Sequence, residues 1–406
     1  MRERIAMPEG ESEGRATAAR FEELMARAEA LIPVLRERAE RAEELRRLPD
    51  ETIADLHSSG LFRMLQPARV GGSELPYRAL FELSAVIGRG CGSTAWVLAN
   101  LAAHHWLLGM WHPEAQEEIW GESPDNLIGS ALIFPRGRAR RVPGGYRLSG
   151  RWPFSSGIDA ATWAMIGALV VDEETGQSEP RIFLVPASDY TIIDTWQVIG
   201  LSGTGSKDVE AADIFVPAHR TLSAERITGG PNRGSGVNPG ALYQLPAISL
   251  FGFAIAGVSL GIARSAIQHF AETTRTRLSV YTGRNLADFR NLQVHLAEAS
   301  ASADAAEAIS LRDCDEATRI TEAGVVPSLE QKARYRRDGA FAATLCTRAV
   351  DILFSASGGG AIYAQNPIQR AFRDVHAANA HYTLTWDVNG AIYGRVALGL
   401  PPEVSL

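Results

Sequence analysis

The sequence contains few cysteines and almost no lysine. Its three cysteines, Cys91, Cys314 and Cys346, are far apart and form no CxxC pair, which argues against a disulfide framework and a structural zinc site. Lysine occurs only at Lys207 and Lys332, which we interpret as a bias of composition rather than a binding device. Because the net charge is −7, we expect no nucleic-acid partner and no attraction to an anionic membrane.

The motifs of several common enzyme classes are also absent. The sequence has no GxGxxG and no GxxxxGK[ST], which leaves dinucleotide-fold and P-loop enzymes without support. Residues 200–204 (GLSGT) depart from the GxSxG nucleophile elbow at the last position. Without HExxH or a cluster of histidines and carboxylates, we expect no metal site. The first residues, through about residue 20, are charged and polar, unlike a signal peptide. We expect no membrane span and predict a cytoplasmic location.

Helical periodicity dominates the first third of the chain. Apolar residues recur at three- and four-residue steps across 20–47, which predicts an amphipathic helix kinked at Pro33. Further helical stretches follow as far as residue 121. We therefore predict a disordered tail over 1–19 and a helical domain over 20–125.

The pattern changes near Asn126. Short segments of alternating or β-branched residues are separated by Gly, Pro and acidic turns, at 127–134, 146–154, 162–171, 181–186 and 209–216. They predict a compact β domain over 126–222. The next segment, 223–240, contains the run GGPNRGSGVNPG (229–240), which is too rich in Gly, Pro and Asn for regular structure. We interpret it as a disordered surface loop, with a mobile lid over a pocket as the alternative.

The remainder, 241–406, is helical again. An alanine-rich stretch at 297–311 suits close packing of helices in a bundle or at a subunit interface, and 367–391 is predicted to form a final helix after a glycine-rich turn. Helices, then grouped strands, then helices within one chain indicate an α+β protein rather than an alternating α/β one.

Four segments stand out by their order: YRLSGRWPFSSG (146–157), IGLSGTGSKDVEAADIFVP (199–217), RTRLSVYTGRNLADFRNLQVHLAE (275–298) and SGGGAIYAQNPIQRAFRDVHAANAH (357–381). Taken singly, Trp152 and Phe154 are explained as core aromatics and the Gly-Ser runs as turns. Together, the segments resemble the acyl-CoA dehydrogenase superfamily over nearly the whole chain. This resemblance implies that family's fold: an N-terminal helical domain, a central β-barrel-like domain and a C-terminal four-helix bundle.

The resemblance also implies a flavin site at the edge of the β domain. In that family the edge strand from Trp152 to Gly157 packs on the isoalloxazine ring, with Ser155 at N5. The implied contacts are Trp152, Phe154, Ser155 and Ser156 from this strand and Ser202, Gly203, Thr204 and Ser206 from the second β segment.

The phosphate side of the flavin is implied to involve two further positions. Arg277 matches an arginine that reaches the flavin phosphate of a neighbouring subunit, and its guanidinium suits a phosphate. A surface arginine on a helix is the alternative. Gly359 lies in a glycine-rich turn that lets backbone approach the cofactor. Because the family's site is completed across subunits, a homotetramer is implied.

A missing carboxylate separates this sequence from the dehydrogenases. Their catalytic base follows the R-D motif, here Arg373-Asp374, but this sequence reads Asn379-Ala380-His381-Tyr382 and has no carboxylate before Asp387. The family's alternative position, on the helix at 251–261, lacks one as well. A histidine at this place instead resembles the group D flavin-dependent monooxygenases, such as para-hydroxyphenylacetate hydroxylase.

Two more positions agree with the phenol hydroxylases of that group. His104 falls where they place a substrate-facing histidine, and Ser130 where they place a serine between the substrate and the C-terminal histidine. His105 leaves a one-residue alternative, and a structural role for His104, on an apolar helix, fits the sequence equally well. His376, between the R-D motif and His381, is interpreted as structural.

The resemblance thus implies the oxygenase component of a two-component monooxygenase. It would take reduced FMN or FAD from a separate flavin reductase, use O2 as co-substrate through a C4a-(hydro)peroxyflavin, and hydroxylate a small phenolic substrate. Ser155 would protect the N5 proton, His381 would hold or supply a proton, and His104 would take the phenolic proton. An N- or S-oxygenase, an acyl-CoA dehydrogenase with a relocated base and a non-catalytic flavin-binding protein are the alternatives.

Overall fold

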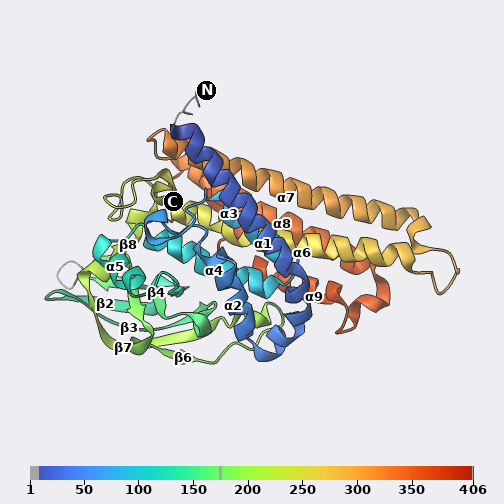
Figure 1. Cartoon of the computed structure of the whole chain (residues 1–406), viewed down its shortest axis with the longest axis horizontal. Coiled ribbons are helices and arrows are strands. Elements are labelled where there is room, and N and C mark those ends of the chain that lie inside the picture. The colour runs from blue at the N-terminus through green and yellow to red at the C-terminus, as the bar shows by residue number, and fades with distance from the viewer. Residues whose placement is uncertain (1–8, 173–175, 405) are drawn as a thin grey trace, which may run out of the picture.

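The computed structural model describes residues 9–172, 176–404 and 406, and its elements follow the predicted order of helices, sheet and helices (Figure 1). The N-terminal helices are α1 (Glu9–Leu45), α2 (Asp50–Ser58), α3 (Arg78–Gly88), α4 (Gly92–Leu108) and α5 (Pro113–Glu122). Helix α1 begins at Glu9 and continues through Pro33, so residues 9–19, predicted to be disordered, are helical, while 1–8 lie outside the described residues. Every residue of α4 is buried, which makes it the central helix of the fold.

The β domain is a single sheet in the order β6-β7-β3-β2-β4-β5-β8, with β1 pairing in parallel beside β4. Its strands are β1 (Ile128–Ala131), β2 (Gly137–Val142), β3 (Gly145–Ser155), β4 (Trp163–Val171), β5 (Ser178–Pro186), β6 (Thr191–Ile193), β7 (Lys207–Pro217) and β8 (Thr221–Ser223). Within the described residues the ends of this path, β6 and β8, do not pair, so the expected barrel-like domain is an open sheet.

The segment 223–240 is anchored rather than disordered. The side chain of Asn238 is buried and donates to the Gly109 carbonyl (2.8 Å), and Gly234 N–H donates to the Met110 carbonyl (3.1 Å). Both bonds satisfy carbonyl groups at the end of α4 that the helix itself leaves unpaired. A Cβ on Gly234 would lie 2.1 Å from the Gly109 oxygen, so only glycine permits this approach. The predicted disordered loop is therefore wrong.

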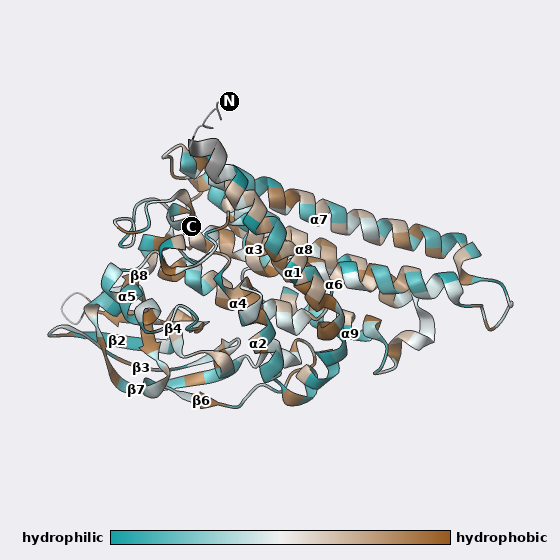
Figure 2. Cartoon of the chain, in the orientation of Figure 1, coloured by the Kyte–Doolittle hydropathy of each residue, from teal (hydrophilic) through white to brown (hydrophobic). Residues whose placement is uncertain are grey.

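The C-terminal helices are α6 (Ala247–Thr276), α7 (Arg290–Glu322), α8 (Leu329–Ala356), α9 (Pro367–Asn379) and α10 (Trp386–Ala397). Helices α6 and α8 are long and apolar enough to cross a membrane by length and composition alone, a test that the buried core helix of a globular protein also passes. In α6 the most apolar 18-residue window is 83% buried within the protein, as in the core helix of a globular fold. Figure 2 shows hydrophilic residues along α7 and hydrophobic residues concentrated around α4.

The predicted final helix, 367–391, is two helices separated by a break at residues 380–385. Asn389 stabilises the break, since its buried amide donates to the Tyr382 carbonyl (3.0 Å) and the Thr385 carbonyl (2.9 Å). Arg336 of α8 in turn donates to the Asn389 Oδ1 atom (3.0 Å). The interruption takes His381 out of regular helix and places it in a short connecting segment.

Candidate functional site

A chain of buried hydroxyl groups follows the edge of the β domain where it meets α4. Trp96 Nε1 donates to Ser156 Oγ (2.9 Å), Ser156 Oγ lies 2.7 Å from Ser206 Oγ, and Ser206 Oγ lies 2.7 Å from Thr204 Oγ1. Thr204 Oγ1 donates to the Leu201 carbonyl (2.8 Å). An indole N–H can only donate and a carbonyl can only accept. All three hydroxyl protons must therefore point along the chain toward Leu201.

Ser155 differs from these hydroxyls because its proton is free. The residue is fully buried, and its Oγ has no hydrogen-bond partner among the described residues. A Cβ on Gly129 of β1 would lie 3.5 Å from this oxygen. Buried polar atoms without a partner are rare in native proteins, and Ser155 Oγ is thus available to a bound group. Ser130, half-buried, follows Gly129 on the opposite face of β1.

His104 on α4 is tied to β1 through one ring nitrogen. Its Nδ1 atom lies 2.6 Å from the Ile128 carbonyl oxygen. Because a carbonyl only accepts, Nδ1 carries the proton, and the neutral ring presents an unprotonated Nε2. This Nε2 is buried without a partner among the described residues. Burial lowers the pKa of His104 to about 4, partly opposed by the bond to Ile128. His104 is therefore a neutral imidazole with a free proton-accepting nitrogen.

His105, the one-residue alternative, occupies a different environment. Its Nδ1 accepts a hydrogen bond from Trp120 Nε1 (3.1 Å), and its ring stacks on the Trp120 indole with centroids 6.1 Å apart. Burial lowers its pKa to about 3. These contacts hold His105 in the core between α4 and α5, whereas His104 is the one that meets β1.

His381 lies in the break between α9 and α10 and is half-buried. Its ring centroid is 5.7 Å from that of Trp96, in an edge arrangement, and 6.3 Å from that of Phe251. Its Nδ1 lies 2.9 Å from Thr383 Oγ1 and accepts from the Thr383 backbone N–H (3.3 Å). Burial lowers its pKa to about 4. Since Trp96 also donates to Ser156, this indole joins His381 to the hydroxyl chain.

The R-D motif holds the hydroxyl-bearing loop in place. Asp374 is buried, and its Oδ1 accepts from the Leu201 backbone N–H (2.7 Å), while Arg373 donates to the Ile199 carbonyl (2.6 Å). Glu43 of α1 pairs with Arg373 (2.9 Å) and with Arg370 (3.1 Å). Burial raises the pKa of Asp374 to about 6. The motif thus binds α1, α9 and the 199–204 segment together.

Trp152 and Phe154, both predicted to contact the flavin ring, lie in different environments. Trp152 is fully buried in the β-domain core, and its Nε1 donates to the Gly167 carbonyl (2.7 Å), so the structure supports the core alternative rather than contact with a ring. Phe154 is 60% exposed at a backbone φ of +68°, edge-on to the Trp196 ring with centroids 6.1 Å apart. An exposed aromatic beside the buried Ser155 offers an apolar surface for a flat ring.

The two remaining residues of the second β segment contact protein rather than open space. Ser202 Oγ donates to the Val198 carbonyl (2.9 Å). A Cβ on Gly203 would lie 2.9 Å from the Ala42 Cβ of α1, so this glycine permits close packing of the loop on α1. Both residues are buried. Their side of the loop faces the helical domain.

Arg277 and Gly359 lie together, away from the hydroxyl chain. Arg277 follows the end of α6, and Gly359 lies in the turn Gly358–Ile362; both are exposed. A Cβ on the neighbouring Gly360 would lie 3.7 Å from Arg277 Nη2. Figure 1 shows the α6–α7 connection at the end of the bundle opposite to α5 and β2. Within one chain, these two positions are not joined to Ser155 or His381 by any contact found among the described residues.

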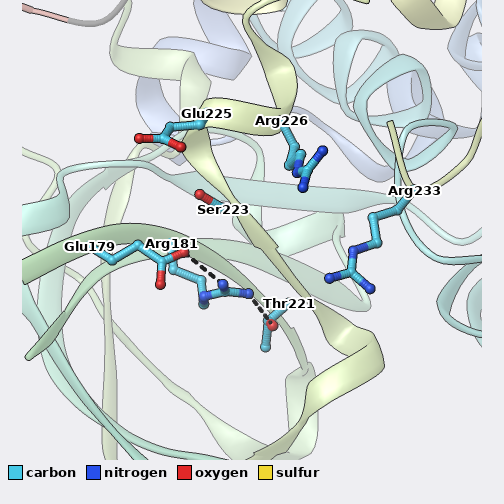
Figure 3. Close-up of a pocket in the computed structure, with 7 residues that line it drawn as sticks. All are labelled: Glu179, Arg181, Thr221, Ser223, Glu225, Arg226 and Arg233. Carbon is cyan, nitrogen blue, oxygen red and sulfur yellow. Dashed lines mark hydrogen bonds and ion pairs between the residues drawn. The ribbon is translucent and has the colours of Figure 1, made fainter. Parts of the chain in front are cut away.

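A basic cavity of about 200 Å³ opens elsewhere, between β5, β8 and the segment that follows β8 (Figure 3). Arg181 at its floor donates to Thr221 Oγ1 (2.9 Å) and pairs with Glu179 (2.6 Å). Arg226 and Arg233 point toward it from the loop. None of the predicted site residues lines this cavity. The predicted site is instead the region between the β-domain edge, α4 and the α9–α10 break.

From the sequence, Trp96 begins the 96–105 stretch expected to shape the pocket but has no assigned contact, and Thr383 is not assigned to this site. Trp96, Asn100 and His104 are four residues apart on α4, a spacing that puts them on one helical face. That spacing was the available signal for Trp96. Thr383, two residues after His381, had none, because its contact depends on the helix break.

The buried Ser155, whose hydroxyl has no partner among the described residues, and the exposed Phe154 fit a bound isoalloxazine, and the fold around them is that of the acyl-CoA dehydrogenases. The family model described as "Acyl-CoA dehydrogenase, C-terminal domain" matches residues 253–386. The oxygenase component of FADH(2)-dependent resorcinol hydroxylase from Rhizobium sp. (strain MTP-10005) is 36% identical over 395 residues, which cover 94% of this chain and 95% of that protein.

Solved structures agree with this comparison. The 3-HSA hydroxylase from Rhodococcus sp. RHA1 is 34% identical, with a TM-score of 0.90 over 94% of this chain and 98% of that one. XiaF from Streptomyces sp., in complex with FADH2 and glycerol, is 31% identical, with a TM-score of 0.90 over 97% of this chain and 100% of that one. The chain therefore belongs to the oxygenase components of two-component flavin-dependent monooxygenases. It is a reduced-flavin-dependent oxidoreductase that works with a separate flavin reductase.

Proposed function

We propose that this enzyme hydroxylates a small phenolic compound, with reduced FAD as its preferred flavin and O2 as co-substrate. The observation that carries the proposal is the state of His104: a buried, neutral imidazole whose Nε2 is free to accept a proton. A relative named as an FADH(2)-dependent resorcinol hydroxylase supports both the phenolic substrate and FAD. When bound, the reduced flavin supplies the electrons that activate O2.

His104 would accept the proton of the substrate hydroxyl at Nε2. Loss of that proton makes an aromatic ring electron-rich at its ortho and para carbons, where an electrophilic oxygen is attacked. The bond from Nδ1–H to the Ile128 carbonyl (2.6 Å) would fix the ring orientation and stabilise positive charge as it develops. Ser130, two residues along β1 from Ile128, would hold the substrate oxygen.

Ser155 would bind the flavin ring through its free hydroxyl, at the N5 edge. The hydroxyl protons of Ser156 and Ser206 are committed to the next hydroxyl of the chain and that of Thr204 to the Leu201 carbonyl, so these groups would serve as acceptors and as structural support. His381 would hold a proton on the opposite side of the site. The apolar rings of Trp96 and Phe251 around His381 would keep water from it.

We further propose a homotetramer in the cytoplasm. Arg277 and Gly359 are exposed, and Arg277 lies beside Gly360, the next residue after Gly359, which suits a phosphate site completed on a neighbouring subunit's flavin. The three buried free cysteines suit a reducing compartment. Light scattering after gel filtration tests the assembly. Mixed oligomers of Arg277→Ala and Ser155→Ala subunits would recover part of the flavin binding if the site is shared, and none if each subunit holds its own.

The function is tested with chemically reduced FAD or FMN, 18O2 and a panel of phenols, indoles, amines and thiophenes. We expect a hydroxylated phenol that carries one labelled oxygen, more with FAD than with FMN. Labelled N- or S-oxides from the panel in place of phenolic products would overturn the substrate class. Purification with tightly held oxidised FAD that an acyl-CoA bleaches would overturn the monooxygenase reading altogether.

A further inference from the structure

We propose that Thr383 is a positioning residue that fixes His381 as the tautomer with its proton on Nε2. The inference concerns a residue outside every predicted contact. It rests on the proposed role of His381 only for its catalytic consequence, whereas the tautomer itself is a property of the free protein.

Two contacts to one ring nitrogen carry the assignment. The Thr383 backbone N–H donates to His381 Nδ1 (3.3 Å), and the Thr383 hydroxyl lies 2.9 Å from the same atom. A backbone N–H cannot accept, so the Nδ1 atom that it meets must be unprotonated. The hydroxyl can then add a second donated bond to the same lone pair. In the neutral ring the remaining proton is on Nε2.

The local backbone makes these contacts possible. A helix continued through residue 383 would use the Thr383 N–H for its own ladder, but the chain leaves helical form after Asn379. Thr383 then turns back on His381, as short polar side chains do when they compete with helical hydrogen bonds. The buried Asn389 amide holds the Tyr382 and Thr385 carbonyls on either side. The contact is therefore a fixed feature of the break.

In this tautomer, His381 has a hydrogen-bond donor at Nε2. No hydrogen bond to His381 Nε2 is found within the described part of the chain, and the ring is only half-buried. The Nε2–H group is thus free to donate a hydrogen bond to a group in the site. His104 has the opposite arrangement, with a protonated Nδ1 and a bare Nε2. Thr383 makes His381 the donor of the pair.

The test compares three variants of the full-length protein. Thr383→Val removes the hydroxyl and keeps the shape, while Thr383→Ser restores the hydroxyl. Thr385→Val is the matched control, because Thr385 Oγ1 donates to the His381 carbonyl (3.2 Å) and does not touch the ring. Histidine ring ¹H–¹⁵N correlation spectra of the flavin-free protein report the tautomer, with the His381 signals assigned from a His381→Gln variant.

We expect Thr383→Val to lower the ratio of Nε2–H to Nδ1–H tautomer roughly fivefold, the scale of one hydrogen bond, and to raise the pH at which His381 is protonated. Thr383→Ser and Thr385→Val should leave both unchanged. A wild-type His381 with its proton on Nδ1 overturns the tautomer assignment, and a ratio in Thr383→Val equal to that of wild type overturns the positioning role of the Thr383 side chain. A shifted ratio with unchanged product per O2 consumed supports the inference but removes His381 from the proposed mechanism.

Discussion

Replacing His104 with asparagine separates its structural bond from its proposed proton-accepting role. The asparagine Nδ2 takes the place of the imidazole Nδ1 and can still donate to the Ile128 carbonyl, whose distance to His104 Nδ1 is 2.6 Å. It has no counterpart of Nε2. Alanine, in contrast, removes both groups and leaves the Ile128 carbonyl unpaired, which should lower the free energy of unfolding by roughly 1–3 kcal/mol. His104→Asn should keep most of that stability.

The low pKa of His104 sets the size of the expected effect. With a pKa of about 4, only about one molecule in 1000 carries a charged imidazole at pH 7. A phenol with a pKa of about 10 would lose its proton to this group at a cost of roughly 8 kcal/mol if transfer preceded reaction. Transfer must therefore accompany formation of the new C–O bond. A positioned base of this kind contributes roughly 10²- to 10⁴-fold.

The assay is a single-turnover measurement of hydroxylation with a series of ring-substituted phenols at pH 7. We expect His104→Asn to slow the hydroxylation of neutral phenols roughly 10²-fold or more. Phenols that are acidic enough to be phenolates at pH 7 need no base. The substitution should slow their hydroxylation by less than about tenfold, which is below the range of general-base catalysis. An equal loss of hydroxylation rate for phenols and phenolates would refute proton acceptance by His104. The contact of His104 with Ile128 would then be its only supported role.

Three other substitutions test the structure around this site. His105→Asn should make the free energy of unfolding depend less on pH below 6.5. Folding lowers the pKa of His105 from 6.5 to about 3, so roughly 5 kcal/mol of the free energy of unfolding that is present above pH 6.5 is lost as the pH falls toward 3. Urea titrations against pH measure this loss, with the half-buried His112→Asn as control. Asp374→Ala should weaken binding of reduced flavin roughly tenfold, the scale of a charged hydrogen bond, in equilibrium titrations, and Asp374→Asn less. Ser155→Ala should raise the peroxide released per product without changing thermal stability.

The sequence was most informative where one face of an element is buried. Strands β3, β4 and β7 alternate or are wholly apolar, and each was predicted within a few residues. Strand β2 reads GRARRV, and its exposed arginines hide the alternation from any apolar pattern. It is a strand because β3 and β4 both pair with it. Pairing with other strands, and not the apolar pattern of β2 itself, therefore makes this segment a strand.

The sequence proposes residues for the candidate site but not the contacts that position them. The offset of His381 from Arg373-Asp374 predicted a site histidine, yet the helical period of 367–391 concealed the break around it. That break depends on Asn389 and on Arg336 from α8, which no local pattern links to His381. Trp152 was misplaced for the converse reason. Its strand lies at the site, but alternation turns this side chain into the β-domain core.

His104 and His381 show why residue type alone does not assign a chemical role. Burial lowers both pKa values to about 4, so the two rings are equally neutral at pH 7. What differs is the backbone group at Nδ1: the Ile128 carbonyl at His104 and the Thr383 N–H at His381. A carbonyl at Nδ1 leaves Nε2 a base, and an N–H at Nδ1 leaves Nε2–H a hydrogen-bond donor. The fold thus derives a proton acceptor and a hydrogen-bond donor from the same side chain.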